Sequence, residues 1–112
     1  MIISKTKLKD VLKIKLDPFK DFRGKYLEIY NSALFKKTRK KIKFIQDDIS
    51  VSKKNVLRGI HGDFRTWKLI TCLEGEFILL VVNNLKNHKD FKKYQFFNLS
   101  DKNNIQILVP PG

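Results

Sequence analysis

The segment WKLITCLEGEFILLVVN, at residues 67–83, carries the strongest secondary-structure signal in this chain. Two apolar runs, 67–73 and 76–83, flank Glu74-Gly75, and a glycine-centred pair of this kind is typical of a hairpin turn. The longest apolar run, 77–82, has the length of one strand and falls far short of the roughly 20 residues that a membrane-spanning helix needs. These residues predict two antiparallel strands joined by a tight turn.

Strand-like segments continue on both sides of this predicted hairpin. Residues 12–16 alternate Leu or Ile with Lys, as expected for a half-buried strand, and Asp17-Pro18 ends that pattern with a turn signal. A short helical turn is expected within residues 31–37, capped by Asn31 or Ser32. The other expected strands lie at residues 25–30, 42–51, 56–61, 94–99 and 105–109. Short strands without a long amphipathic helix predict an all-β sandwich or barrel.

Length and composition set limits on the class of protein. A chain of 112 residues holds one small domain, and a hydrophobic share of 42% is too high for a disordered chain. Residues 1–5 lack the basic start and apolar stretch of a signal peptide. Cys72 is the only cysteine, so an internal disulfide is excluded, and we expect a buried, reduced thiol in a cytoplasmic protein without a membrane partner.

The formal net charge of +13 raises the question of a nucleic-acid partner. The basic residues comprise 20 Lys and only 4 Arg, however, and they are spread along the whole chain. Recognition of phosphates and base edges relies more on the planar fork of Arg. We therefore interpret the charge as a solvated basic surface and do not expect a nucleic-acid partner.

Two groups of polar residues interrupt the strand pattern in an ordered way. The first is Asp21-x-Arg23-Gly24-x-x-x-Glu28. The second contains a row of alternate polar residues, then Arg58-Gly59-Ile60-His61, and then Lys68-Leu69. On a strand the row would share one face, which must meet solvent or a polar cavity; its members are Gln46, Asp48, Ser50 and Ser52.

This ordered set resembles the family of nucleotide-linked 4-keto-6-deoxysugar 3,5-epimerases, typified by dTDP-4-dehydrorhamnose 3,5-epimerase. The family pattern runs D-x-R-G-x-x-x-E, Q-x-N-x-S-x-S, R-G-x-H, a Lys-Leu pair and a Gly-centred hairpin. The motifs match in order and in approximate spacing over nearly the whole chain. The last of them is the hairpin centred on Gly75. It implies a cupin-type jelly-roll barrel, in agreement with the all-β prediction.

The resemblance also implies a mechanism and a set of site residues. His61 would be the general base that removes a proton next to the 4-keto group, and Lys68 would stabilise the resulting enolate. Positions that match nucleotide or diphosphate contacts of the family are Arg23, Glu28, Gln46, Asp48 and Arg58. No metal or cofactor is required, because the keto group already accepts the electron pair.

The family also implies a biological setting and a partner. Its members make activated deoxysugars for surface polysaccharides, so the expected substrate is a nucleotide-diphosphate sugar. They are homodimers that share strands between subunits, and we expect the same self-association here.

The sequence departs from the family pattern at several positions. Asp48 replaces the usual Asn, Asp63 replaces a Gln, and Asn83 replaces an Asp. The turn signal Pro110-Pro111-Gly112 would lead into another strand, so we expect a barrel that is incomplete at its carboxyl end. The family's general-acid Tyr and the Asp that orients the catalytic His come after this turn, and the activity of these 112 residues alone is therefore left open.

Three alternatives remain beside this interpretation. A related 3,4-ketoisomerase would share the fold and the keto-sugar chemistry. A metal-binding cupin would use His61 and Asp63, which alternate onto one strand face, although such proteins usually offer more His ligands. A non-catalytic basic module would bind nucleic acid or acidic polysaccharide with aromatic platforms at Phe64, Trp67 and Tyr94.

Overall fold

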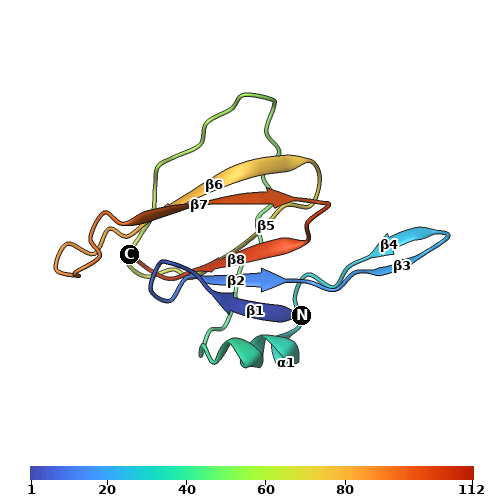
Figure 1. Cartoon of the computed structure of the whole chain (residues 1–112), viewed down its shortest axis with the longest axis horizontal. Coiled ribbons are helices and arrows are strands. Elements are labelled where there is room, and N and C mark those ends of the chain that lie inside the picture. Colours follow the sequence, from blue (N-terminus) through green and yellow to red (C-terminus); the bar gives the residue numbers. More distant parts are fainter.

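Strands dominate the computed structural model, which describes all of residues 1–112 (Figure 1). The regular elements in chain order are β1 (Ile2–Lys5), β2 (Leu12–Lys15), β3 (Phe19–Asp21), β4 (Gly24–Tyr26), α1 (Ser32–Phe35), the 3-10 turn η1 (Lys36–Thr38), β5 (Lys68–Thr71), β6 (Glu76–Val82), β7 (Tyr94–Ser100) and β8 (Ile105–Val109). None of these elements is a helix that could span a membrane.

The strands form one larger antiparallel sheet and two strand pairs. The larger sheet has the order β1-β2-β8-β5, and β6 with β7 forms a separate pair that lies against it (Figure 1). The third pair, β3 with β4, projects away from the rest of the molecule. The all-β prediction is therefore confirmed, with strands 12–15, 94–100 and 105–109 close to their expected bounds.

The larger sheet carries a hydrophobic core on each face. The interior core lies between the sheet and the β6–β7 pair, and it is built from Leu8, Val11, Val81, Phe97, Leu99 and Ile107. The outer core lies between the sheet and α1, and it is built from Leu12, Ile14, Leu16, Phe35 and Leu108. Ile107 and Leu108 are neighbours in β8 and both fully buried, because successive side chains of a strand point to opposite faces.

The helical turn forms where the sequence predicts it. The Asn31 side chain accepts hydrogen bonds from the backbone N–H groups of Ala33, at 3.0 Å, and Leu34, at 3.3 Å. Phe35 is buried and packs against the rings of Tyr30 and Phe44, with centroid separations of 5.6 and 5.3 Å. The cap and this aromatic cluster hold α1 over the outer face of the sheet.

The predicted hairpin at Gly75 is wrong in its pairing. β5 pairs with β8 and β6 pairs with β7, so the turn at Gly75 carries the chain from one sheet to the other. Gly75 has a φ of +75° and exchanges hydrogen bonds with Asp101, whose carboxylate and backbone N–H each lie 3.1 Å from it. The local sequence marks the turn correctly, but the interior core decides which strands become neighbours.

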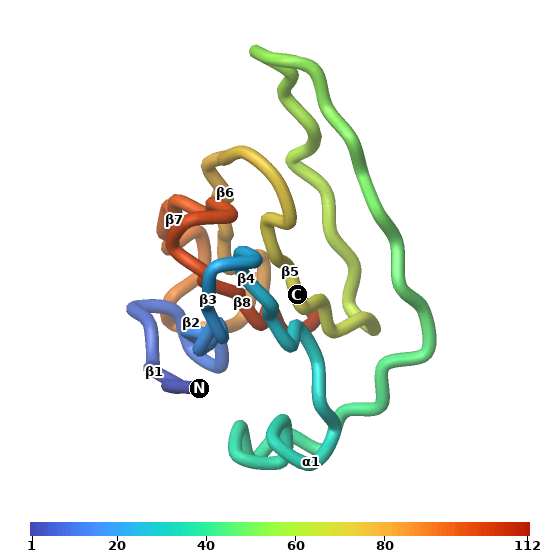
Figure 2. The backbone as a smooth tube through the Cα atoms, turned by 90° about the vertical axis from the view of Figure 1, so that its right-hand side faces the viewer, coloured from blue at the N-terminus to red at the C-terminus, as the bar shows by residue number.

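Two further predicted strands are absent. Residues 39–67, which include the expected strands 42–51 and 56–61, contain neither helix nor strand. They form a long extended loop with two limbs (Figure 2). The part of this loop that comprises residues 45–66 is called the arm below. Its apolar side chains are exposed, among them Ile45 at 88% and Leu57 at 88%. No neighbouring strand meets the hydrogen-bonding groups of the arm, so its alternating pattern does not become a sheet.

Candidate functional site

Lys68 begins β5 at one end of the interior core. It pairs with Val109, and strand alternation places it on the same face as Ile70, which packs into that core. It is the only charged residue in β5 and β8. An ammonium group at the rim of an apolar interior can stabilise a negative charge that develops on a ligand bound there.

Asp63 is the nearest carboxylate to Lys68. Its Oδ2 lies 3.4 Å from Lys68 Nζ, and its Oδ1 accepts hydrogen bonds from the N–H groups of Arg65, at 2.8 Å, and Thr66, at 2.6 Å. The Arg65 and Thr66 N–H groups lower the pKa of Asp63 from 3.8 to about 2. The carbonyl of Asp63 also accepts from Gly112 N at 2.8 Å. The sequence analysis treats Asp63 as a possible metal ligand and does not predict this role. An Asp whose carboxylate accepts hydrogen bonds from the N–H groups two and three residues later is nevertheless a common turn signal.

His61 lies where the arm returns toward β5, and its side chain is exposed. It makes no hydrogen bond in the structure, so neither ring nitrogen is committed to a protein group. Gly59 has a φ of +98°, and a Cβ built there would lie 3.0 Å from His61 Nδ1. A residue with a Cβ at position 59 would crowd the His61 imidazole, and glycine leaves that space free.

The polar row lies on the arm as two small groups. Gln46 Nε2 donates to Asp48 Oδ2 at 2.9 Å. Near the tip, Arg58 Nε donates to Ser52 Oγ at 2.8 Å and so joins the two limbs. A second bond from Arg58 Nη2 reaches the Val51 carbonyl at 3.3 Å. These side chains are exposed, so their charges and amides are available to a ligand in this conformation.

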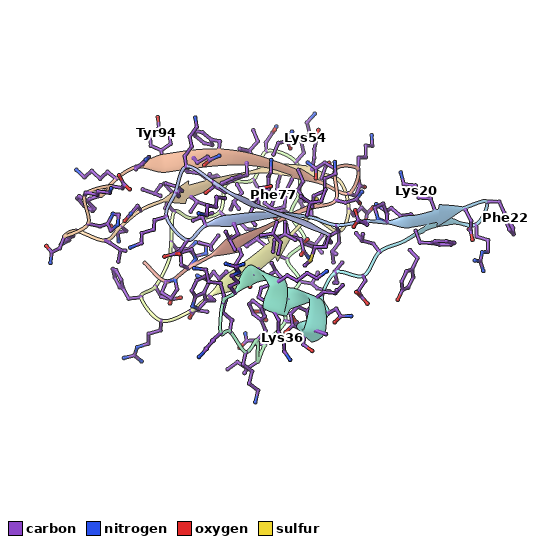
Figure 3. The ribbon with its side chains drawn as sticks, turned by 60° about the horizontal axis from the view of Figure 1, so that its bottom comes forward. Lys20, Phe22, Lys36, Lys54, Phe77 and Tyr94 are labelled. Carbon is purple, nitrogen blue, oxygen red and sulfur yellow. The ribbon has the colours of Figure 1, made fainter.

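Arg23 lies at the far end of the β3–β4 pair. Figure 3 shows its neighbour Phe22 at the outermost point of the molecule, and Phe22 is 98% exposed. The guanidinium binds Asp21, with Nη2 to Oδ2 at 2.6 Å, and this hydrogen bond lowers the pKa of Asp21. Arg23 is therefore oriented by a local ion pair, and the β3–β4 pair whose turn carries it projects away from the arm and from β5 (Figure 1).

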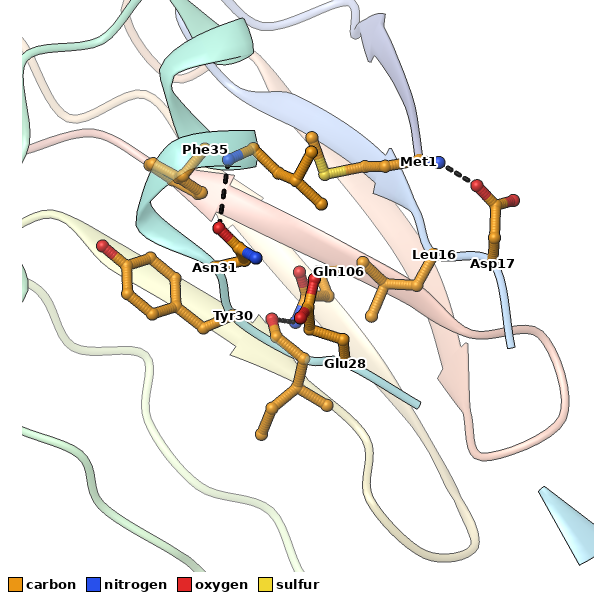
Figure 4. Close-up of a pocket in the computed structure, with 10 residues that line it drawn as sticks. Met1, Leu16, Asp17, Glu28, Tyr30, Asn31, Phe35 and Gln106 are labelled. Carbon is orange, nitrogen blue, oxygen red and sulfur yellow. Dashed lines mark hydrogen bonds and ion pairs between the residues drawn. The ribbon is translucent and has the colours of Figure 1, made fainter. Parts of the chain in front are cut away.

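Glu28 lines a separate pocket of about 110 Å³ between the larger sheet and α1 (Figure 4). Gln106 crosses the pocket floor, where its Nε2 donates to the Ile29 carbonyl at 2.8 Å. The amino terminus of Met1 is ion-paired with Asp17 at the pocket rim. The structure thus brings together Gln46 with Asp48 and Lys68 with Asp63, but it leaves Arg23 and Glu28 apart from them.

The structure also bears on a metal site and on the reactivity of the lone thiol. No group of three or more His, Cys, Asp or Glu side chains is arranged to hold a metal ion, and Asp63 is already engaged by backbone N–H groups. Cys72 packs against the interior core, donates to the carbonyls of Glu74 and Gly75 at 3.3 Å, and has its pKa raised by burial. A raised pKa keeps this thiol protonated and makes it a poor nucleophile.

Comparison with known proteins settles the family. The sequence model of the dTDP-4-dehydrorhamnose 3,5-epimerase family matches residues 5–112. This chain belongs to the dTDP-4-dehydrorhamnose 3,5-epimerase family. The 3,5-epimerase of Salmonella typhimurium is 39% identical over the whole chain, and that of Methanothermobacter thermautotrophicus is 31% identical over 96% of it. The chain spans 63% and 60% of the lengths of these two relatives.

Solved structures of 3,5-epimerases superpose closely on this member of the family. The enzyme of Elizabethkingia anophelis has a TM-score of 0.87 at 38% identity and covers 100% of this chain, which corresponds to 63% of that protein. The enzyme of Legionella pneumophila, solved in complex with dTDP-4-keto-L-rhamnose, has a TM-score of 0.91 at 27% identity and covers 99% of this chain, or 61% of that protein. The two facing sheets are therefore those of a cupin-type jelly roll, as the family resemblance implies.

Proposed function

We propose that this chain carries the proton-abstracting half of a nucleotide-sugar epimerase site, acting on a dTDP-linked 4-keto-6-deoxysugar at C3, or at C3 and C5. The observation that supports this most directly is the position of Lys68. It is the one charged residue in β5 and β8, and it lies at the rim of the interior core. The names of the relatives and the ligand of the Legionella pneumophila enzyme indicate the class of substrate.

The proposed reaction starts at the carbon next to the 4-keto group. The imidazole of His61 accepts the C3 or C5 proton, and the electron pair of the broken C–H bond moves onto the keto oxygen. The Lys68 ammonium stabilises the enolate that forms, while Asp63 holds Lys68 in place at 3.4 Å. A proton from water then adds to the opposite face of the same carbon, which restores the ketone and inverts the centre, and the imidazole of His61 releases the first proton to solvent.

The nucleotide would be held by the residues that match the family pattern. Arg58 suits the diphosphate because its guanidinium is planar and permanently charged, and its Nε is already oriented by Ser52. Gln46 and Asp48 offer hydrogen-bonding groups for the base and the ribose, whereas Glu28 lies in the separate pocket beside α1 and would reach the same nucleotide only from a second copy of the chain.

Arg23 supports a second element of the proposal, a homodimer. The β3–β4 pair projects outward with exposed Phe19, Phe22 and Tyr26, which a partner would bury. In one chain Arg23 is far from Lys68, so a contact of both residues with one substrate requires a second copy to supply one of them. The exposed apolar side chains of the arm, such as Ile49, would be covered by the same association.

The proposed role lies in the synthesis of an activated deoxysugar for surface polysaccharide. The compartment that fits is the cytoplasm, where a lone thiol such as Cys72 stays reduced.

Proton NMR in D₂O tests the proposed function. The folded chain is mixed with a panel of 4-keto-6-deoxysugars linked to dTDP, UDP or GDP, and the C3 and C5 signals are followed. We expect catalysed loss of the C3 signal, or of both signals, for the dTDP sugar. A product with the keto group moved to C3 would instead identify a 3,4-ketoisomerase, and the absence of any exchange by a folded chain would contradict the proposal.

A further inference from the structure

The β3–β4 pair, residues 19–26, has little packing against the rest of the molecule. Its strands are three residues long and pair only with each other (Figure 1). Its large apolar side chains, Phe19, Phe22 and Tyr26, are each more than half exposed. Because a two-stranded hairpin is marginally stable by itself in water, the direction in which this pair projects depends on other contacts.

Lys25 makes the only hydrogen bonds between the β3–β4 pair and the rest of the chain. Its Nζ donates to the backbone carbonyl of Asp101 and to Asn104 Oδ1, the latter at 3.0 Å. The other hydrogen bonds that involve side chains of the pair join Arg23 to Asp21 and remain within it. Both acceptors of Lys25 belong to the turn between β7 and β8, so one ammonium group links the projecting pair to that turn.

The β7–β8 turn is itself held in place by backbone hydrogen bonds. Asp101 exchanges hydrogen bonds with Gly75, both at 3.1 Å, and the Asn104 carbonyl accepts from Leu16 N at 2.9 Å. The two oxygens that Lys25 reaches are therefore fixed relative to the Gly75 turn and to the end of β2. A contact with this turn can define a direction for the β3–β4 pair.

Lys20 offers a direct comparison within the same pair. It lies opposite Lys25 in the strand register, so the two ammonium groups belong to one face of the pair, where like charges repel. Lys25 has two oxygen acceptors, whereas Lys20 takes part in no hydrogen bond or ion pair and lies on the projecting pair in Figure 3. Lys20 therefore matches Lys25 in charge and side chain and differs in the link to the β7–β8 turn.

The direction of the β3–β4 pair decides where Arg23 lies. Arg23 belongs to the turn between β3 and β4, and its guanidinium is held on Asp21 at 2.6 Å. This ion pair fixes the guanidinium relative to the hairpin, and the link through Lys25 fixes the hairpin relative to the two sheets. A group that is held in place before a ligand binds loses less conformational freedom on binding and so binds more tightly.

We propose that Lys25 is a positioning residue for substrate binding: its link to the β7–β8 turn fixes the direction of the β3–β4 pair and thereby places Arg23 for the nucleotide held by a second copy of the chain. This inference rests on the proposed function, in which Arg23 of one copy meets the substrate bound near Lys68 of the other.

Electron-spin distance measurements test the link without any turnover. Spin labels at Phe22→Cys and Ile78→Cys, both at exposed positions, report the distance from the tip of the pair to β6 in a chain that also carries Cys72→Ser. Dilution with unlabelled chain confines the measurement to one copy. We expect a narrow distance distribution with Lys25 present, a clearly broader one for Lys25→Met, and no change for Lys20→Met. Equal widths with and without Lys25 would overturn the proposal.

Calorimetric titration with dTDP tests whether Lys25 acts through Arg23. Arg23→Met should weaken binding about tenfold, because one charge-assisted hydrogen bond is lost. Lys25→Met should weaken it at least about threefold, whereas Lys20→Met should change it less than about twofold. The double variant should bind no more weakly than Arg23→Met alone, because a residue that acts through another adds nothing once that other is removed.

The remaining outcomes separate this inference from the proposed reaction. Losses that multiply in the double variant, or a wild type that does not bind dTDP, would overturn the positioning role of Lys25. If the distance and dTDP results are as expected but the wild type catalyses no proton exchange, the proposed reaction is contradicted and the positioning role is still supported.

Discussion

Lys68 Nζ and Asp63 Oδ2 lie 3.4 Å apart at the rim of the interior core, and they form the only ion pair made by a residue of β5. Both side chains are about 40% exposed, at 41% and 42%, so solvent weakens their attraction. The pair therefore contributes little to stability, and its main effect is to restrict where the ammonium group can go.

Replacement of Lys68 tests its proposed role in the reaction. Lys68→Met should slow exchange of the C3 or C5 proton by about 100-fold or more, because the enolate loses its stabilising charge. The affinity for dTDP alone should change little, since Lys68 is assigned to the sugar and not to the nucleotide. Lys36→Met is the matched control, and an equal loss of rate there would contradict a specific role for Lys68.

The lowered pKa of Asp63 predicts an effect on stability in acid. The folded value of about 2 lies below the ordinary 3.8, so the stabilising contribution is complete above pH 4 and is lost as the pH falls toward 2. Asp63→Asn should therefore be less stable than the wild type at pH 6, with a difference that shrinks between pH 4 and 2. Urea unfolding at several pH values measures this, with Asp47→Asn on the arm as the control.

A constant difference between Asp63→Asn and the wild type across this pH range would show that the charge of Asp63 has no part in holding the turn.

The interior core predicts a large and local effect on stability. Ile107→Ala should lower the free energy of unfolding by about 2–5 kcal/mol, because Ile107 is fully buried between the two sheets. Ile78→Ala lies on the exposed face of β6 and should cost at most about 1 kcal/mol. Comparable losses in the two variants, measured by urea unfolding, would contradict the assignment of the core.

The turn at Gly75 tests how the chain passes between the sheets. Gly75→Ala should cost about 1–2 kcal/mol, because the φ of +75° disfavours any residue with a Cβ although the space around it is free. Gly62→Ala meets no neighbour and has no positive φ, so it should be close to neutral. Equal thermal midpoints for wild type and Gly75→Ala would contradict the left-handed geometry of this turn.

The sequence predicts those parts of the fold that depend on local patterns. Alternation in residues 12–16 and 105–109 identifies two central strands, and Asn31 caps the helical turn as expected. The short edge strand β1 was not predicted, because the segment IISK lacks both alternation and turn signals. β3 was not predicted for a different reason, because its three residues are too few to show an alternating pattern.

The failures concern partners that are distant in sequence. Residues 42–51 alternate as a strand should, but a strand also needs a neighbour, and none lies beside the arm. The sequence marks the turn at Gly75, but its two strands join different sheets: β5 pairs with β8, where Ile70 lies opposite Ile107, and β6 pairs with β7, where Leu79 lies opposite Phe97. For the site, motif order selects His61 and Lys68 as candidates, whereas the contact between Lys68 and Asp63 appears only in three dimensions.

The most direct test of the central claim is the dependence of proton exchange on His61. Wild type and His61→Ala, each shown to be folded by circular dichroism, are compared by proton NMR in D₂O with a dTDP-linked 4-keto-6-deoxysugar. We expect exchange at C3, or at C3 and C5, by the wild type, and a rate at least about 100-fold lower for His61→Ala with an unchanged thermal midpoint. Exchange that proceeds equally fast without the imidazole, or no exchange by the folded wild type, would contradict the claim that this chain supplies the base of an epimerase.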